Sequence, residues 1–522
     1  MDVLHPASTG DFDRAEPLAR IVGRIEAAFV AREYSLVGEL IERNLLAAWF
    51  GIEPHRFAEI VAALLERGDA VGPTLRALSA IMLTDPNAPR PAAPDAGAGA
   101  PEAESPEAVA VVENLTAAGL MFSLRLEGRM TEAFAGAETL LTRKTPMRPV
   151  YDWNRGWALF SSVQYGLTAM LAGRFAEALV SFTNARMHGR VPALHFLTRD
   201  ACVRAAVIEA LYGDVVKARA LLEEAESIPR TSSWVEPELD ALYALADALV
   251  RAPAAEALAR IDAVTLSSLG ESWPFYFAAL QYALQRASNL PEAVRRAAVF
   301  AQLPLPVVAG DGYAGSIQAI CSAVTSAAQG DLGEARAQIE SADRSLHLTR
   351  LVLALIEMAS GRFDEALRIG LNLREATAGL RRLEVWRRAT VAECYWALGE
   401  EEACAAIIAL VLAEPDAIRA DEIPYFSRGL RDFARQRFPA WPSADDTVAP
   451  QFVFIGEGQE NLTDRELESL RLLAQGLSRE QIAKAQFISI NTVKGNLGSL
   501  YRKLGVGSRA AAVTAGEQRG LL

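Results

Sequence analysis

Apolar residues near the carboxyl end of the chain recur at steps of three and four, the period of an amphipathic helix. Between residues 490 and 504, one face of such a helix carries Ile490, Val493, Leu497, Leu500 and Leu504. The opposite face carries Asn491, Lys494, Gly495, Gly498 and Arg502. We therefore expect one face to pack against other helices, while the polar face stays free to meet a partner.

The neighbouring sequence predicts where the other helices of this region begin and end. Thr463–Glu466 and Ser478–Gln481 both have the spacing of a capping box, in which two side chains satisfy free N–H groups at a helix start. Gly476 is suited to end the first helix, because glycine tolerates the left-handed conformation. Ser489 is expected to open the third helix and Ser508 a fourth.

A second pattern runs through the middle of the chain: an apolar helix, a small turn residue, and then a Glu-Ala step into a second helix. The glutamate of this pattern, which is replaced by lysine at one position, recurs at steps of 31 to 45 residues. It is found at Glu132, Glu177, Lys217, Glu256, Glu292, Glu334 and Glu365, and the pattern returns more loosely after Gly399. A repeat of this kind is typical of helical hairpins that bury their apolar faces by stacking. It resembles tetratricopeptide (TPR) repeats with lengthened helices and predicts a TPR-like α-solenoid. An irregular all-helical domain is the alternative.

Two segments rich in proline and small residues interrupt the helical pattern and divide the chain. The expected all-α organisation is a helical segment at 11–83, a linker at 84–106, the repeat domain at 107–438, a hinge at 439–460 and the C-terminal unit at 461–522.

Composition and charge agree with a helical protein that has a basic end. Hydrophobic residues make up 51% of the chain, and its longest apolar run, Ala403–Ala413, is too short to cross a bilayer. With no basic, apolar leader at the start, we expect a cytoplasmic protein without membrane contact. The formal net charge is −13, but residues 461–522 hold nine Lys and Arg against five Asp and Glu. Contact with nucleic-acid phosphates is therefore expected at the C-terminal end alone.

The sequence contains no pattern typical of an enzyme or a metal site. No phosphate-binding GxxxxGK[ST] motif occurs, the five histidines lack the spacing of metal ligands, and the four cysteines form no CxxC pair. We expect no catalytic residue, no cofactor and no metal. Aromatic residues around Trp157, Trp273–Phe277 and Trp386 either line a ligand groove or form the core of the hairpins.

The C-terminal sequence resembles the LuxR-type (GerE-like) helix-turn-helix family. The matching residues run without a gap from Leu462 to Leu522, and include Thr463-x-Arg465-Glu466, Ala474-x-Gly476-Leu477-Ser478, Ile488-Ser489-x-x-Thr492-Val493-Lys494 and Tyr501-Arg502-Lys503-Leu504-Gly505. The resemblance implies a four-helix domain whose third helix enters the major groove of double-stranded DNA, often with a dimer contact through the fourth. Separately, Ala31–Phe50 is similar to the helices that follow the ATPase in large ATP-binding LuxR-type regulators. The chain resembles such a regulator without its nucleotide domain.

The resemblance also assigns roles to single residues. Base-facing positions are implied for Lys494, Gly495 and Gly498. Contacts with the DNA backbone are implied for Thr463, Arg479, Ser489, Thr492, Arg502, Lys503, Ser508 and Arg509.

Four departures from the family pattern change this picture. Ser469 replaces the usual valine and Gln486 the usual leucine, so two expected core positions are polar. Gly495 and Gly498 leave the groove-facing stripe almost without side chains, at a cost on the order of 2 kcal/mol of helix stability. We therefore expect weak direct readout of bases, with contacts from phosphate-binding residues, Lys494, Asn491 and Asn496.

Together these features predict a DNA-binding transcriptional regulator that forms a homodimer on DNA. The helical-repeat body is expected to receive a signal from a small molecule or a protein. One alternative is a helical-repeat interaction scaffold with a degenerate helix-turn-helix. Another is a sigma-factor-like subunit, disfavoured because no aromatic, basic DNA-melting domain precedes the C-terminal unit.

Overall fold

The computed structural model describes residues 16–67, 72, 75, 106–142, 156–188, 191–442, 462, 464–504, 509 and 512–513. Within these ranges the regular secondary structure is α-helix or short 3-10 helix, which confirms the all-α prediction. The expected linker at 84–106 (apart from Pro106) and the hinge from residue 443 onward lie outside the described residues.

The chain divides into two compact units. Unit 1 takes in Met1–Cys321, Ser341–Leu346 and Gly379–Arg381, and unit 2 takes in Ser322–Glu340, His347–Ala378 and Arg382–Leu522. This division does not test the domain boundaries expected from the sequence, which stay a prediction.

Unit 1 begins with four short helices: α1 (Leu18–Val30), α2 (Tyr34–Arg43), α3 (Leu45–Gly51) and α4 (Pro54–Leu65). The end of α3 is tied to the later part of the unit by hydrogen bonds and by stacked aromatic rings. The Trp234 indole N–H donates to the Trp49 carbonyl at 2.8 Å, and the Ser233 hydroxyl donates to the Phe50 carbonyl at 2.7 Å. The Phe50 ring also packs on Phe196 and Trp234. These contacts make the N-terminal helices part of the same unit as the hairpins that follow.

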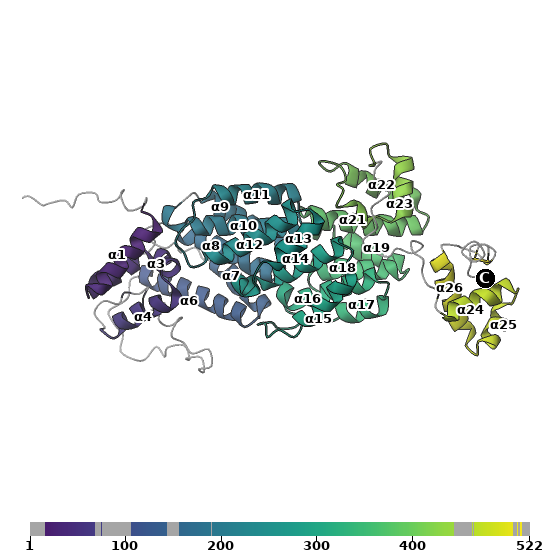
Figure 1. The fold of residues 1–522 in the computed structure, drawn as a ribbon, viewed down its shortest axis with the longest axis horizontal. Helices are drawn as coiled ribbons and strands as arrows, with labels where there is room; N and C mark the ends of the chain where they lie inside the picture. Colours follow the sequence, from purple (N-terminus) through teal and green to yellow (C-terminus); the bar gives the residue numbers. More distant parts are fainter. Residues whose placement is uncertain are drawn as a thin grey trace, which may run out of the picture. The chain divides into compact units, whose positions relative to one another are not determined.

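Paired helices make up the rest of unit 1 (Figure 1). The pairs are α6 (Pro106–Leu126) with α7 (Met130–Thr142), α8 (Trp157–Leu171) with α9 (Phe175–Met187), α10 (His195–Leu211) with α11 (Val215–Ser227), α12 (Glu236–Arg251) with α13 (Ala254–Asp262), and α14 (Trp273–Arg286) with α15 (Leu290–Phe300). The 3-10 helices η2 (Pro192–Leu194) and η3 (Leu266–Ser272) lie between pairs, and the division between the two units falls within α16 (Gly312–Ala328).

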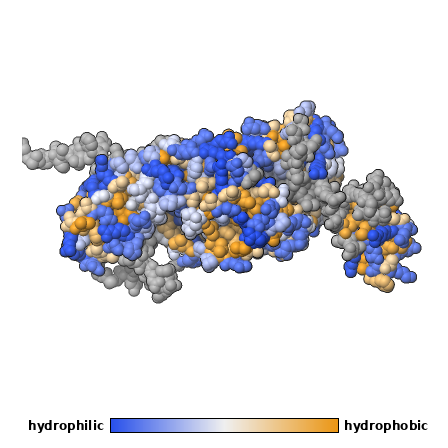
Figure 2. Space-filling view, viewed as in Figure 1, coloured by the Kyte–Doolittle hydropathy of each residue, from blue (hydrophilic) through white to orange (hydrophobic). Residues whose placement is uncertain are grey.

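Unit 2 continues the paired pattern. Its helices are α17 (Leu332–Ile339), α18 (His347–Ala359), α19 (Phe363–Asn372), α20 (Arg374–Thr377), α21 (Arg381–Ala397, of which Arg381 belongs to unit 1), α22 (Glu401–Leu412), η4 (Ile423–Tyr425) and α23 (Arg428–Arg437), followed by three C-terminal helices. In the space-filling view, hydrophilic residues cover much of the visible face, interrupted by hydrophobic patches (Figure 2).

The repeated sequence pattern marks the turn inside each pair, as predicted. Its turn residue adopts the left-handed backbone at Gly128, Gly173, Gly330, Gly361 and Gly399, where φ lies between 75° and 82°. Five residues after each turn position comes a small residue that is at most 2% exposed; these residues are Ala133, Ala178, Ala218, Ala257, Ala293, Ala335, Ala366 and Cys404. A small side chain here lets the second helix approach the first closely. The stacking of these pairs into a TPR-like solenoid stays a prediction.

The aromatic residues around Trp273 belong to the hydrophobic core. Trp273, Phe275 and Phe277 are each at most 3% exposed. Phe275 stacks on Tyr313, whose hydroxyl is hydrogen-bonded to that of Tyr212 at 2.6 Å. The sequence left open whether these aromatic residues line a ligand groove or form the core of the hairpins, and these three lie in the core.

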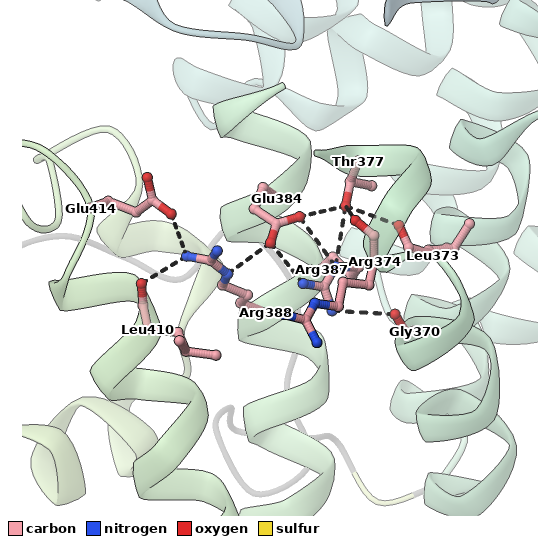
Figure 3. Close-up of polar contacts among 9 residues, drawn as sticks. All are labelled: Gly370, Leu373, Arg374, Thr377, Glu384, Arg387, Arg388, Leu410 and Glu414. Atoms are coloured by element: carbon pink, nitrogen blue, oxygen red, sulfur yellow. Dashed lines mark hydrogen bonds and ion pairs between the residues drawn. The ribbon is translucent and has the colours of Figure 1, made fainter. Parts of the chain in front are cut away.

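A buried ionic network in unit 2 is centred on Glu384 of α21 (Figure 3). Its carboxylate accepts hydrogen bonds from Arg387 at 2.8 Å, from Arg388 at 2.9 Å and from the Thr377 hydroxyl at 2.5 Å. Burial opposes ionisation of Glu384, but the hydrogen bonds from Arg387 and Thr377 outweigh it, so the pKa of Glu384 lies below its usual value. The carboxylate is therefore held in its charged form.

The two arginines extend this network to neighbouring helices (Figure 3). Arg387 donates to the Gly370 carbonyl in α19 at 3.4 Å. Arg388 donates to the Leu410 carbonyl in α22 and to the Glu414 carboxylate, both at 2.8 Å. One carboxylate thus orients two guanidinium groups that link α21 to helices on either side.

No helix in the described part of the chain is long and apolar enough to span a membrane.

Ser288 occupies the turn position that glycine holds in most pairs, and it adopts a left-handed φ of 53°. We predict that Ser288→Gly raises the free energy of unfolding by about 0.5–1 kcal/mol, because glycine carries no Cβ penalty there. Urea unfolding followed by circular dichroism measures the change. Gly330→Ser is the reverse control, since φ is 82° there and an added Cβ meets no atom within 4 Å. A loss of stability in Ser288→Gly would contradict the prediction.

Replacing the central carboxylate of the network is expected to destabilise unit 2 in a pH-dependent way. Glu384→Gln should lower the free energy of unfolding at neutral pH by about 3 kcal/mol, because the buried Arg387 loses its counter-charge, while Arg388 keeps its ion pair with Glu414. A lowered folded-state pKa means that the stabilisation is complete above the unfolded-state pKa of about 4.3 and is lost as the pH falls through the folded-state value. The difference in the free energy of unfolding between the wild-type protein and Glu384→Gln should therefore become smaller as the pH falls.

Urea titrations from neutral to acidic pH test this dependence. Glu365→Gln is the matched control, because Glu365 pairs with Arg368 on the exposed surface of α19 and should matter much less. If the difference in the free energy of unfolding between wild type and Glu384→Gln stays constant down to acidic pH, the charge of Glu384 is not what stabilises the unit.

Candidate DNA-binding domain

Three helices near the carboxyl end form a separate hydrophobic core: α24 (Asp464–Ala474), α25 (Arg479–Ala485) and α26 (Ile490–Leu504). Gly476 follows α24 with a left-handed φ of 89°, so the predicted end of this helix is confirmed. A short turn joins α25 to α26, so these elements have the order helix, turn, helix, with α26 as the second helix.

The predicted cap at the start of α25 is also confirmed. The Ser478 hydroxyl accepts from the Gln481 amide at 3.3 Å, and the Gln481 side-chain oxygen accepts from the Ser478 amide at 2.7 Å. The other expected capping box includes Thr463, which lies outside the described residues.

Ser489 caps α26 as predicted, because its hydroxyl accepts from the Thr492 amide at 3.1 Å and is hydrogen-bonded to the Thr492 hydroxyl at 2.8 Å. Of the expected fourth helix, Arg509, Ala512 and Val513 are described and are helical. Ser508, the expected start of that helix, lies outside the described residues.

The apolar face of α26 is buried from its second turn onward. Val493, Leu497, Leu500 and Leu504 are each at most 3% exposed and pack with Leu470, Leu473, Ile482, Ala483 and Ala512. Ile490 was expected on the same face, but it is 43% exposed, so that part of the prediction is wrong. As the first helical residue, it precedes the turn that packs on α24 and α25, and Ile488 packs against the core instead.

The opposite face of α26 is open. Thr492, Lys494, Gly495 and Gly498 are exposed, and a Cβ added at either glycine meets no atom within 4 Å. Arg479 at the start of α25 is exposed as well. Asn491, Arg502 and Lys503 belong to α26, but their side chains are not among those described. The described part of the predicted site is therefore presented outward by one helix and the end of another.

Asn496 differs from its neighbours on α26. The residue is half-buried, and within the described part of the chain its buried Nδ2 has no hydrogen-bond partner. A buried polar atom without a partner costs about 1–3 kcal/mol. The amide nitrogen of Asn496 thus does not lie on the open face with Lys494.

The Arg509 guanidinium is bound to the end of α24. It donates to the Leu473 carbonyl at 2.8 Å and to the Leu477 carbonyl at 3.0 Å. The Leu473 carbonyl belongs to the last turn of α24, where a cation is favoured by the helix dipole, and the Leu477 carbonyl follows that helix. The resemblance implies a DNA-backbone contact for Arg509, whereas its described contacts are structural and join the fourth-helix segment to α24.

The two polar residues at expected core positions contact each other. Ser469 is fully buried, and its hydroxyl donates to the Arg465 carbonyl at 2.8 Å. The Gln486 amide nitrogen donates to the Ser469 hydroxyl at 3.0 Å and to the Arg465 carbonyl at 3.3 Å. The two departures from the family pattern are therefore one compensated change.

A further buried polar contact links α24 to α26. The Ser499 hydroxyl donates to Glu466 at 2.6 Å, and Glu466 is 6% exposed. This bond is made across 33 residues of sequence, so the local capping pattern did not predict it.

Among the described residues, no group of three or more His, Cys, Asp or Glu side chains is placed to hold a metal ion.

Residues 460–515 match the family model described as bacterial regulatory proteins, luxR family. A nitrate/nitrite response regulator protein homolog of Haemophilus influenzae is 55% identical over 53 residues, which is 10% of this chain and 26% of that protein. A nitrate/nitrite response regulator protein of Escherichia coli is 57% identical over 51 residues, 10% of this chain and 24% of that protein. The C-terminal domain is a LuxR-type helix-turn-helix domain.

A longer match is found with a putative HTH-type transcriptional regulator of Mycobacterium bovis. It is 32% identical over 161 residues, which cover 29% of this chain and 16% of the mycobacterial protein. The chain thus spans about a quarter of the length of the two response regulators and less of the mycobacterial regulator.

A double-mutant cycle tests the Ser469–Gln486 pair. Ser469→Val and Gln486→Leu alone are each expected to lower the free energy of unfolding by about 0.5–1.5 kcal/mol, because each removes the hydrogen bond between the two side chains and leaves the remaining polar group with only its bond to the Arg465 carbonyl. The double variant restores the two apolar residues usual in the family and should lose less than the sum of the singles.

The cycle is measured by amide hydrogen exchange of α24 and α26 in the whole chain, which reports the stability of this domain by itself. Ser478→Ala combined with Gln486→Leu is the matched control, because Ser478 does not contact Gln486, and its effects should add. Additive effects in the Ser469 and Gln486 cycle would refute the compensation.

Proposed function

We propose that this protein is a DNA-binding transcriptional regulator in which α26 enters the major groove of double-stranded DNA. The observation that carries the proposal is the division of α26 into a buried apolar face and an open face with Lys494, Gly495 and Gly498. The major groove admits one helix, whose outward residues meet base edges. The names of the relatives as response and transcriptional regulators support the same function.

The two glycines on the open face favour close approach to DNA. Neither has a left-handed φ, and neither is packed against another residue, so the fold of the domain does not require glycine there. Together they cost on the order of 2 kcal/mol of helix stability. A helix without side chains at these positions brings its backbone nearer to the groove floor, and Lys494 is the long side chain beside them.

Contacts with phosphates are proposed around this helix. Arg479, Ser489 and Thr492 lie at the exposed N-terminal ends of α25 and α26, where free amide groups favour an anion. Arg502, Lys503, Thr463 and Ser508 join them on the basis of the family resemblance, whereas Asn491 is proposed to act beside Lys494 on the groove-facing side of α26. We assign Arg509 an indirect role, since its described bonds hold α24 in place.

We further propose that the helical pairs receive the signal, from a small molecule or a protein partner, and that the protein binds DNA as a homodimer. Paired helices of this type present broad surfaces suited to a partner. The acidic balance of the chain outside residues 461–522 keeps its attraction for DNA confined to the C-terminal domain.

Binding of the whole chain to a randomised duplex library, followed by gel shifts over a salt series, tests the function. Lys494→Ala should weaken binding to the selected duplex by about 1–3 kcal/mol and relax the preference at one position, because it removes a base contact. Arg479→Ala should weaken binding to all duplexes alike and reduce the salt slope by about 1, because it removes a phosphate contact.

Lys217→Ala is the control, because Lys217 is also exposed but lies on α11 in unit 1. It should leave binding unchanged. If the wild-type chain enriches no duplex, or if Lys494→Ala behaves like Lys217→Ala, the proposal is wrong, and the interaction scaffold with a degenerate helix-turn-helix becomes the better account.

A further inference from the structure

Phe487 stands in the turn between α25 and α26 in a conformation that is costly for its residue type. Its φ is 55°, in the left-handed region, and its side chain is 95% exposed. The backbone around it is well formed, because the Ile488 amide donates to the Ala483 carbonyl at 3.0 Å. The turn is therefore held firmly, and the ring is projected outward from it.

The folded domain gains little from this phenylalanine. A left-handed backbone costs a residue with a side chain about 1–2 kcal/mol, and glycine or asparagine would relieve it. The hydrophobic core takes in Ile488 but not Phe487, and no aromatic ring in the described part of the chain stacks on it. An exposed aromatic residue at a strained position indicates a contact made with another molecule.

Close to Phe487 in the sequence are one further exposed apolar residue and two exposed lysines. Ile490, three residues further on, is 43% exposed in the first turn of α26. Lys484 precedes the ring by three residues and Lys494 follows Ile490 by one helical turn, and both are exposed. An exposed ring followed by an exposed apolar residue, on a domain with exposed lysines on α25 and α26, suits a partner that combines negative charge with a small apolar group.

Duplex DNA has this combination in its major groove. The thymine 5-methyl group is the apolar group on the base edges there, and phosphates line both sides of the groove. The N-terminal residues of a recognition helix are the ones nearest to base edges, and Phe487 lies three residues before the first residue of α26.

We propose that Phe487, supported by Ile490, contacts a thymine 5-methyl group and thereby selects thymine at one position of each half-site. The proposal rests on the function proposed above, because it requires α26 to lie in the major groove. It adds a specificity-determining residue outside the helix itself, on a domain whose glycines leave few side chains to read bases.

The probe is the tightest duplex selected from the randomised library by the whole wild-type chain, with each thymidine replaced in turn by deoxyuridine. Deoxyuridine keeps every hydrogen-bonding group and lacks only the methyl group. At one position in each half-site the wild-type affinity should fall about fourfold, the effect of one methyl group removed from water. Phe487→Asn should bind the two duplexes equally and keep the wild-type salt slope, since no charge is lost.

Two controls separate this role from a structural one. Phe487→Asn should fold with equal or greater resistance to urea, because asparagine tolerates the left-handed turn. Met187→Asn changes another strongly exposed apolar residue, on α9 in unit 1, and should leave the discrimination between thymidine and deoxyuridine intact.

Several outcomes overturn the inference. Wild-type protein that ignores deoxyuridine at every position, or Phe487→Asn that still discriminates, shows that the ring does not read the methyl group. A destabilised Phe487→Asn domain shows that the ring serves the fold. Loss of self-association with unchanged discrimination places the ring at a subunit contact. If the wild-type chain selects no duplex at all, the proposed function fails together with this inference.

Discussion

The arrangement of the C-terminal domain depends on the burial of one face of α26 against α24 and α25. Val493, Leu497, Leu500 and Leu504 are almost completely removed from solvent, and each such side chain contributes about 1.5–3 kcal/mol. This exceeds the cost of the two glycines on the other face. Because side chains on a helix are spaced at fixed angles, burying the leucines leaves Lys494 and the glycines facing outward. The open face is thus a consequence of the core.

Apart from the Asn496 amide nitrogen, the polar groups described in this core are paired. Ser469 and Gln486 bond to each other and to the Arg465 carbonyl, and Glu466 accepts from Ser499 across α24 and α26. Arg509 uses its charge to hold the carbonyls at the end of α24. Polar atoms that would otherwise be costly in a small core become directional contacts, which fix how the helices meet.

In most of the helical pairs, two local features set the geometry: a turn residue with a left-handed backbone, and a small buried residue five positions later. The first reverses the chain and the second permits close helix contact. Larger side chains then fill the spaces between pairs, as Tyr212, Phe275 and Tyr313 do in unit 1. Charged groups are buried where several partners surround them, as at Glu384.

Much of this was available from the sequence, because helix periodicity, caps and turn residues act over a few positions. The start of each second helix, the capping box at Ser478 and the buried leucines of α26 were predicted in this way and are confirmed. The exposure of Ile490, the buried amide of Asn496, the carbonyl contacts of Arg509 and the pairing of Ser469 with Gln486 were not. These features depend on which residues meet after the helices pack, and residues 17 to 36 positions apart in the chain come into contact only then. The sequence by itself determined where the helices run and which faces are apolar, and the tertiary structure decided which polar groups remain free to bind DNA.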